Sequence, residues 1–180
     1  RVMTDAGKRR SPSGLALVAG RLKNRPDSEH QQSIIRLVIV IIAVLYFLFL
    51  YTAAEFREPS VWAGFLFVSG YLVLSIVYIA AIIIRPQKSV ARRLAAMVTD
   101  FATMSALMHL GGEGASVLFL LYLWVAFGNG FRYGLPYLAA ATVVSVLGFL
   151  FVMFTTEYWL EQRTLAWGLL AALIVLPAYV

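Results

Sequence analysis

Long apolar stretches separated by short polar segments make up most of the chain. A helix needs about 20 mostly apolar residues to cross the hydrocarbon core of a bilayer, so each stretch predicts a membrane-spanning helix. The predicted helices span approximately residues 34–53, 61–84, 94–110, 116–127, 135–156 and 165–180. The fourth is short for a full crossing, and the alternative is a five-span protein in which it is re-entrant. The pattern therefore predicts an all-α membrane protein, a polytopic bundle of about six transmembrane helices.

The two ends of the chain depart from this pattern in different ways. Residues 1–25 are basic and rich in small polar side chains, which predicts a disordered segment or one that lies on the membrane surface. Residues 26–180 form the predicted transmembrane domain. The last apolar stretch reaches the final residue without a polar flank, so we expect the native chain to continue beyond it.

Composition supports a membrane environment. Hydrophobic residues make up 61% of the chain, charged residues make up 13%, and the mean hydropathy is +0.82. Soluble domains have about 45–50% apolar and about 25% charged residues. These values exclude a disordered chain and a nucleic-acid-binding protein. The absence of cysteine excludes disulfides and thiolate metal sites.

The basic residues predict how the bundle is oriented. They gather in the N-terminal segment, in the loop at residues 85–93, and at Arg132 after the fourth predicted helix. The other loops are acidic or balanced. Because lysine and arginine favour the cytoplasmic side, the sequence predicts a multi-pass protein with both termini in the cytoplasm.

Asp100 lies near the middle of the third predicted helix. A carboxylate at that depth costs about 2.5–3.5 kcal/mol on insertion scales, and such residues are candidates for function by default. Arg93 lies seven positions earlier, on nearly the same face of the helix. One interpretation is a proton or ligand site, or a switch that changes partner between states. The other is a structural hydrogen bond to a neighbouring helix. Small residues at a spacing of four, from Ala91 to Thr103, place this helix at the centre of the bundle or at a dimer seam.

A polar segment before the first predicted helix supplies further candidates. Ser28 is a plausible N-cap, and Gln31 stands where the second partner of a capping box belongs. Arg36 lies one turn into the helix and can extend its charge toward the interface. Capping alone explains the segment, and a ligand role is the alternative.

Two glycine-containing segments are the remaining candidates. His109 and Glu113 flank a glycine pair, and we interpret them as a tight turn with a solvated Glu113, because two ligands are too few for a metal site. Residues 128–134 contain three glycines together with Asn129 and Arg132. This segment lacks the phosphate-binding loop pattern and predicts a cytoplasmic hairpin or re-entrant turn. Arg132 there would pair with an acid, a lipid phosphate or a carboxylate ligand, and a plain turn is the alternative.

No motif of a hydrolase, kinase, protease or phosphotransferase occurs in these residues. We therefore expect no catalytic residues, cofactor or metal in this segment.

Four motifs, in this order, resemble the membrane input region of RpfC-type hybrid sensor histidine kinases, the family that senses diffusible signal factor. The resemblance covers residues of about 25–180. The motifs are Asp27-Ser28-Glu29-His30 with Arg36, Arg85-Pro86-Gln87 with Ser89, Arg92 and Arg93, then Asp100, and Gly128-Asn129-Gly130 with Arg132-Tyr133-Gly134.

This resemblance implies a function and a set of partners. It implies a homodimer in the bacterial inner membrane, followed by a cytoplasmic ATP-dependent kinase that passes phosphate to a response regulator. The signal it implies is a cis-2-unsaturated fatty acid. His30 and His109 are not expected to be phosphoacceptors.

A fatty-acid signal would need an apolar groove for its tail, at about 0.8 kcal/mol per buried methylene, and a cation or N–H pair for its carboxylate. It would regulate the kinase only by binding two states of the bundle unequally. The candidate ligand-binding or signalling residues are Asp27, Glu29, Gln32, Arg36, Asp100, Glu113, Asn129, Arg132 and Tyr133.

Two other functions remain open at this point. One is a small proton- or substrate-coupled transporter with Asp100 and Arg93 in its path. The other is a lipid-modifying enzyme, which the lack of paired carboxylates or metal ligands disfavours.

Overall fold

The computed structural model describes residues 28–52 and 59–180, and in these ranges all regular secondary structure is helical. The predicted segment 1–25 and Asp27 lie outside the described residues. The elements are α2 (Glu29–Thr52), α3 (Pro59–Ile84), α4 (Val90–Gly111), the 3₁₀ helix η1 (Gly112–Leu118), α5 (Phe119–Tyr133), α6 (Leu135–Thr155), α7 (Glu157–Glu161) and α8 (Arg163–Tyr179).

Four stretches of the described residues are long and apolar enough to cross a membrane. They are Glu29–Phe49, Val61–Ile84, Val90–Tyr133 and Leu135–Thr155. The third is 44 residues long and holds both α4 and α5, and Arg163–Tyr179 is a shorter apolar helix. The predicted all-α membrane bundle is therefore confirmed.

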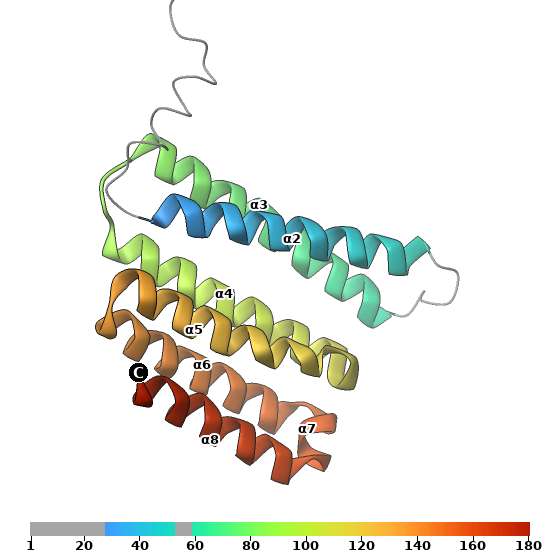
Figure 1. Cartoon of the computed structure of the whole chain (residues 1–180). Helices are drawn as coiled ribbons and strands as arrows, with labels where there is room; N and C mark the ends of the chain where they lie inside the picture. The colour runs from blue at the N-terminus through green and yellow to red at the C-terminus, as the bar shows by residue number, and fades with distance from the viewer. Residues whose placement is uncertain (1–27, 53–58) are drawn as a thin grey trace, which may run out of the picture.

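Successive long helices run antiparallel, so the connections alternate between two ends of the bundle (Figure 1). One end holds the start of α2, the α3–α4 loop, the α5–α6 turn and the C-terminus of α8. We call it the basic end, because the basic loop at residues 85–93 and Arg132 lie there. The other end holds η1 and α7 with their acidic residues.

Local signals explain several helix boundaries. Pro59 opens α3, where its missing N–H costs little, and α3 stops at Ile84, two residues before Pro86. Ser89 caps α4, since its Oγ accepts a hydrogen bond of 3.3 Å from the Arg92 backbone N–H. The first helix was predicted to begin near residue 34, but α2 begins at Glu29, directly after the predicted cap Ser28.

The hairpin predicted at residues 128–134 is wrong. The predicted fourth helix, 116–127, begins as η1, and α5 then continues through the glycines to Tyr133. The whole turn into α6 is made at Gly134, whose φ of 92° favours glycine. Gly130 stays helical because it lies against α6, where an added Cβ would come within 3.0 Å of Leu138. The short helix α7 was also not predicted.

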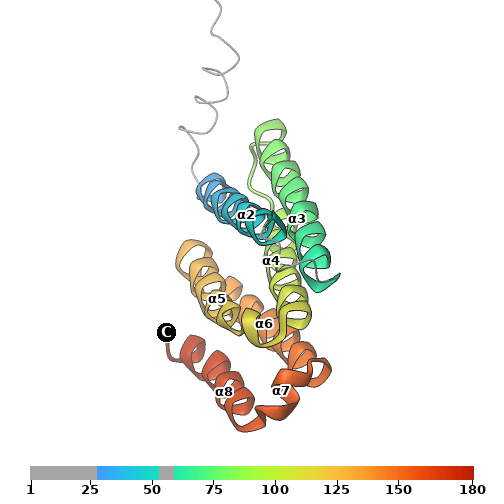
Figure 2. The same cartoon turned by 90° about the vertical axis from the view of Figure 1, so that its right-hand side faces the viewer.

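An aromatic core joins α4, α5, α6 and α8. Phe101, Tyr122, Phe149 and Trp159 are buried within it. α4 and α6 approach closely at Gly148, where an added Cβ would lie 2.6 Å from Ser105 Oγ. Figure 2 shows the helices obliquely, with α2 and α3 at one edge of the bundle and α8 at the other.

Candidate functional site

The face of α2 that turns toward the bundle is polar over its first two turns. Glu29, Ser33 and Arg36 are at least nine-tenths buried, and Gln32 is half-buried between them. Their spacing of three or four residues places them on one side of a helix. The same face continues with Val40 and Ala43, which line an apolar cavity.

At the basic end, Glu29 joins α2 to the start of α4. Its carboxylate pairs with Arg92, whose Nε lies 3.2 Å from Glu29 Oε2, and with Arg93, whose Nε lies 2.6 Å from Oε1. Arg92 also donates to the backbone carbonyls of Arg85 and Gln87 at 3.0 and 2.9 Å. One carboxylate therefore ties α2 to both the α3–α4 loop and the first turn of α4.

Two turns further along α2, Arg36 meets Asp100 in a buried ion pair. Arg36 Nη2 donates to Asp100 Oδ2 at 2.7 Å, and Nε lies 2.6 Å from Oδ1. The Tyr71 hydroxyl on α3 donates to the same carboxylate. The Arg36 guanidinium lies 5.5 Å from the centroid of the Tyr78 ring. Asp100 is thus held by a cation from α2 and a hydroxyl from α3.

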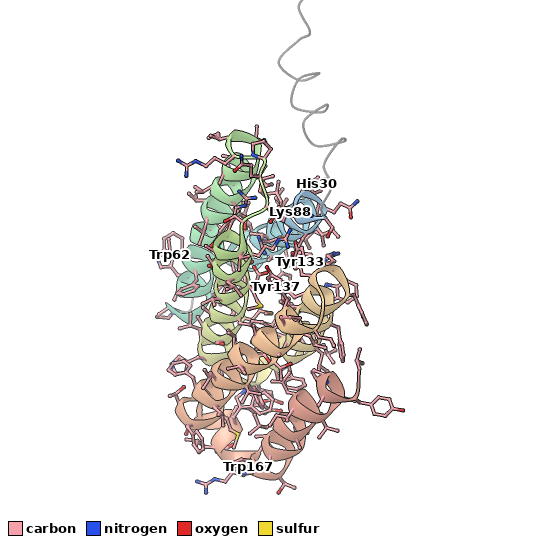
Figure 3. The ribbon with its side chains drawn as sticks, turned by 90° about the vertical axis from the view of Figure 1, so that its left-hand side faces the viewer. His30, Trp62, Lys88, Tyr133, Tyr137 and Trp167 are labelled. Carbon is pink, nitrogen blue, oxygen red and sulfur yellow. The ribbon has the colours of Figure 1, made fainter. Side chains whose placement is uncertain are left out.

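The third contact of α2 is with α5. Gln32 donates to Asn129 Oδ1 at 3.5 Å and accepts from the Tyr133 hydroxyl at 2.8 Å. Asn129 Nδ2 donates to the Val125 carbonyl at 2.8 Å, which fixes the orientation of its amide. Arg93 lies 4.2 Å from the Tyr133 ring centroid and 5.8 Å from that of Tyr137. Figure 3 looks onto this end and shows both tyrosines between α4 and the α5–α6 turn.

We call this network the α2 clasp; its residues are Glu29, Gln32, Arg36, Tyr71, Arg92, Arg93, Asp100, Asn129 and Tyr133. It includes six of the nine predicted site residues, all except Asp27, Glu113 and Arg132. Arg93, which the sequence places on nearly the same face of α4 as Asp100, pairs with Glu29, while Asp100 pairs with Arg36.

An apolar cavity of about 150 Å³ lies beside the clasp, toward the opposite end of the bundle. Five polar side chains line it, and four of them meet at one end. These four are Gln32, Arg36, Tyr71 and Asp100, and the fifth is Thr103. The rest of the lining is apolar and includes Ile39, Val40, Ala43, Val68, Met104, Leu107, Leu118, Leu121 and Val125. The lining is therefore complementary to an amphipathic molecule, and Arg36 is the single cation at its polar end.

A second, much smaller cavity lies on the other side of Arg36. Its volume is about 20 Å³, and Glu29, Ser33, Arg92 and Tyr133 are among the polar residues around it. This is enough space for about one water molecule. Arg36 lines both cavities and so separates the apolar one from the polar basic end.

Two predicted site residues do not join the clasp. Glu113 is exposed on η1, beyond the opposite end of α4. Arg132 lies on α5 near its end and forms no ion pair within the described residues, so its predicted pairing with an acid is not found. His109 lies one turn before Glu113. Its Nδ1 is within hydrogen-bonding distance of the hydroxyls of Thr156 and Thr155, at 3.1 and 3.2 Å.

Sequence reasoning missed Tyr71 and Tyr78 as contributors to the site. Together with Ser75 they form a row at positions i, i+4 and i+7, which marks the polar side of an otherwise apolar helix. That row was the available signal. No group of three or more potential metal ligands occurs within the described ranges.

The chain is therefore a helical membrane bundle whose interior holds a cluster of charged and aromatic side chains beside an apolar cavity. It is 39% identical over 167 residues to the sensory/regulatory protein RpfC of Xanthomonas campestris pv. campestris, in each of two strains. The match covers 93% of this chain and 23% of the relative, so the chain spans about a quarter of the length of these curated relatives. The resemblance to RpfC-type proteins is thereby confirmed. No family model and no solved structure matches the chain.

Proposed function

We propose that the chain is the transmembrane signal-input region of a two-component hybrid sensor histidine kinase, and that it binds a fatty-acid-type signal, such as a cis-2-unsaturated fatty acid. In this proposal the protein is a homodimer in the bacterial inner membrane. The signal regulates autophosphorylation of a cytoplasmic kinase, which passes phosphate to a response regulator. Support comes from the similarity to RpfC over 93% of the chain and from the cavity beside Arg36.

The observation that carries the proposal is the polarity of the apolar cavity beside the α2 clasp. Its lining is mostly apolar, and at one end Arg36 presents the guanidinium that a carboxylate headgroup needs. A dry cavity of about 150 Å³ holds a benzene molecule in a soluble protein. The cavity therefore has room for a segment of about six carbons of an acyl chain.

Regulation would follow from the way α2 is attached. α2 packs along α3 and meets α4 and α5 mainly through the clasp. A headgroup that bound Arg36 would change the contact between α2 and Asp100. The ligand would then favour one arrangement of α2 against α4 over another, which is the requirement for a signal.

A binding measurement tests the site directly. A spin-labelled fatty acid in lipid nanodiscs that hold the chain should show an immobilised component in its EPR spectrum. Ala43→Phe places a ring in the cavity and should weaken binding about tenfold, since about two buried methylenes are worth ~0.8 kcal/mol each. Ala139→Phe makes the same change on an exposed face of α6 and should leave binding unchanged. Equal binding by both variants would contradict the proposed site.

A second experiment tests the kinase link. The full-length protein in proteoliposomes should incorporate phosphate from ATP at a rate that changes when the fatty acid is added. Ala43→Phe should raise the fatty-acid concentration needed for the response about tenfold while keeping the basal rate. A rate that does not respond to the fatty acid in the unsubstituted protein would contradict the proposed regulation.

The proposed orientation is also testable, because the chain contains no cysteine of its own. Single substitutions Lys88→Cys and Arg132→Cys should react with an impermeant thiol reagent only from the cytoplasmic side. Glu113→Cys should react only from the outside. Labelling of positions 88 and 132 from opposite sides would exclude the proposed arrangement.

A further inference from the structure

The charges beside the apolar cavity balance before any ligand binds. Asp100 from α4 faces Arg36 from α2 and the Tyr71 hydroxyl from α3, and Tyr78 from α3 lies over the guanidinium. The α5 residues that line the cavity are apolar, and α6 carries no charged side chain. Arg36 is therefore the cation of the cavity, and a carboxylate already occupies it.

An anionic headgroup would bring a second negative charge to one guanidinium. An unpaired charge at membrane depth is costly, and two anions that share a site favour protonation of one of them. Resting on the proposed fatty-acid site, we propose that the anionic headgroup replaces Asp100 at Arg36, and that Asp100 takes up one proton from water as it leaves the guanidinium.

The charge of the site is unchanged by this exchange. The ligand adds one negative charge, and the proton, which comes from solvent and binds a carboxylate oxygen of Asp100, adds one positive charge. Neutral Asp100 keeps a hydrogen-bond partner, because its carbonyl oxygen still accepts from Tyr71. The small polar cavity on the basic side of Arg36 offers a place for the water through which the proton arrives.

The binding site would therefore respond to pH as well as to the signal. Signal binding and proton binding favour the same state and so strengthen each other, as reciprocal linkage requires. The fatty acid also titrates, so its own ionisation would obscure the effect. A ligand that stays ionised at all relevant pH values separates the two.

The test uses the full chain in lipid nanodiscs, with dodecyl sulfonate as a permanently ionised probe and dodecanoate as its carboxylate counterpart. Calorimetric titration in two buffers of different ionisation enthalpy counts the protons taken up. We expect about one proton per bound sulfonate, and an affinity that falls about tenfold for each pH unit over the range where Asp100 is ionised in the free protein.

Two outcomes overturn the inference in distinguishable ways. Sulfonate that binds with no proton uptake and with an affinity independent of pH would overturn the exchange and leave the fatty-acid site standing. A lack of saturable binding by both sulfonate and dodecanoate would overturn the exchange together with the proposed function.

Two variants locate the proton. Asp100→Asn removes the titrating group, so sulfonate should bind with an affinity that no longer depends on pH and with no proton uptake. Tyr71→Phe keeps both charges and removes a donor that favours the ionised carboxylate. It should therefore shift the loss of sulfonate affinity to higher pH. Asp100 would be excluded as the proton acceptor by either of two results. One is proton uptake in Asp100→Asn equal to that of the unsubstituted protein. The other is a sulfonate affinity that falls over the same pH range in Tyr71→Phe as in the unsubstituted protein.

Discussion

α2 and α6 are both long apolar helices, yet they turn opposite kinds of side chain toward the bundle. The buried residues of α6 are Leu138, Ala141, Ser145, Phe149, Val152 and Met153, which are mostly apolar. The buried residues of α2 are Glu29, Ser33, Arg36 and Val40. Lipid solvates apolar side chains as well as a protein core does, so hydrophobicity alone does not decide which face of a membrane helix is buried. α6 is held by close packing, whereas α2, which packs along α3, is joined to α4 and α5 by charges and hydrogen bonds.

This difference separates a fixed part of the molecule from an adjustable one. Close packing has few alternatives, because interiors are dense and change shape at a cost. Ion pairs and hydrogen bonds can exchange partners when a ligand or a proton arrives. The α2 clasp is therefore the part of the bundle that is suited to respond to a signal, and the aromatic core is the part that keeps its shape.

The largest expected effect comes from breaking the buried ion pair of α2. Arg36→Ala should lower the free energy of unfolding by about 3–5 kcal/mol, because it leaves Asp100 buried without its cation. Reversible unfolding in mixed micelles, followed by tryptophan fluorescence, measures the change. The double variant Arg36→Leu with Asp100→Leu should recover most of the loss. A single variant as stable as the unsubstituted protein would show that the pair does not hold α2.

The corresponding change in α6 removes packing rather than charge. Phe149→Ala should cost about 2 kcal/mol in the same assay, from about 24 cal/mol per Å³ for a cavity of about 100 Å³. Phe131→Ala removes the same side chain from an exposed position and should have little effect. The cost of Phe149→Ala should not depend on salt, since no charge is involved. A strong salt dependence would contradict the idea that α6 is held by packing alone.

The stability cost of a substitution at Glu29 should depend on salt, unlike that of Phe149→Ala in α6. Glu29 pairs with two arginines that are themselves partly accessible, with side-chain exposures of 12% and 13%. Glu29→Gln should cost about 1 kcal/mol at low salt, and less at about 1 M salt, where the Debye length falls to about 3 Å. Unfolding measured at both salt concentrations checks this. Equal costs at both would show that the pairs are fully shielded from solvent.

Much of this organisation could be predicted from the sequence, for a specific reason. Apolar length predicts membrane helices, and Pro86 indicates where α3 ends. The start of α4 was expected near residue 94, but Ser89 caps it four residues earlier, at Val90. Asp100 was foreseeable as a candidate because a charge within an apolar stretch needs a partner. Arg36 was expected to reach toward the interface, and it is instead buried against Asp100. Which helices lie side by side cannot be inferred from the local sequence pattern. The pairs Asp100–Arg36 and Arg93–Glu29 could therefore not be predicted.

The errors share one physical cause. Residues 128–133 contain helix-weakening glycines, which predicted a hairpin, but the helix continues because contacts with α6 and α2 outweigh propensity. Tyr71 was overlooked because tyrosine is common in membrane helices and becomes a site residue only through its contact with Asp100. In both cases tertiary contact decides what local sequence leaves open.

The smallest expected effect lies at the contact between α2 and α5. Tyr133→Phe removes the hydroxyl that donates to Gln32 and keeps the ring beneath Arg93. Hydrogen bonds between membrane helices average about 0.6 kcal/mol, so stability should fall by about that amount. Tyr133→Leu removes the ring as well and should cost about 0.5–1 kcal/mol more, from the lost cation–π contact. If both variants lost the same stability, the ring would contribute nothing, and α5 would be joined to α2 through the hydrogen bonds of Gln32.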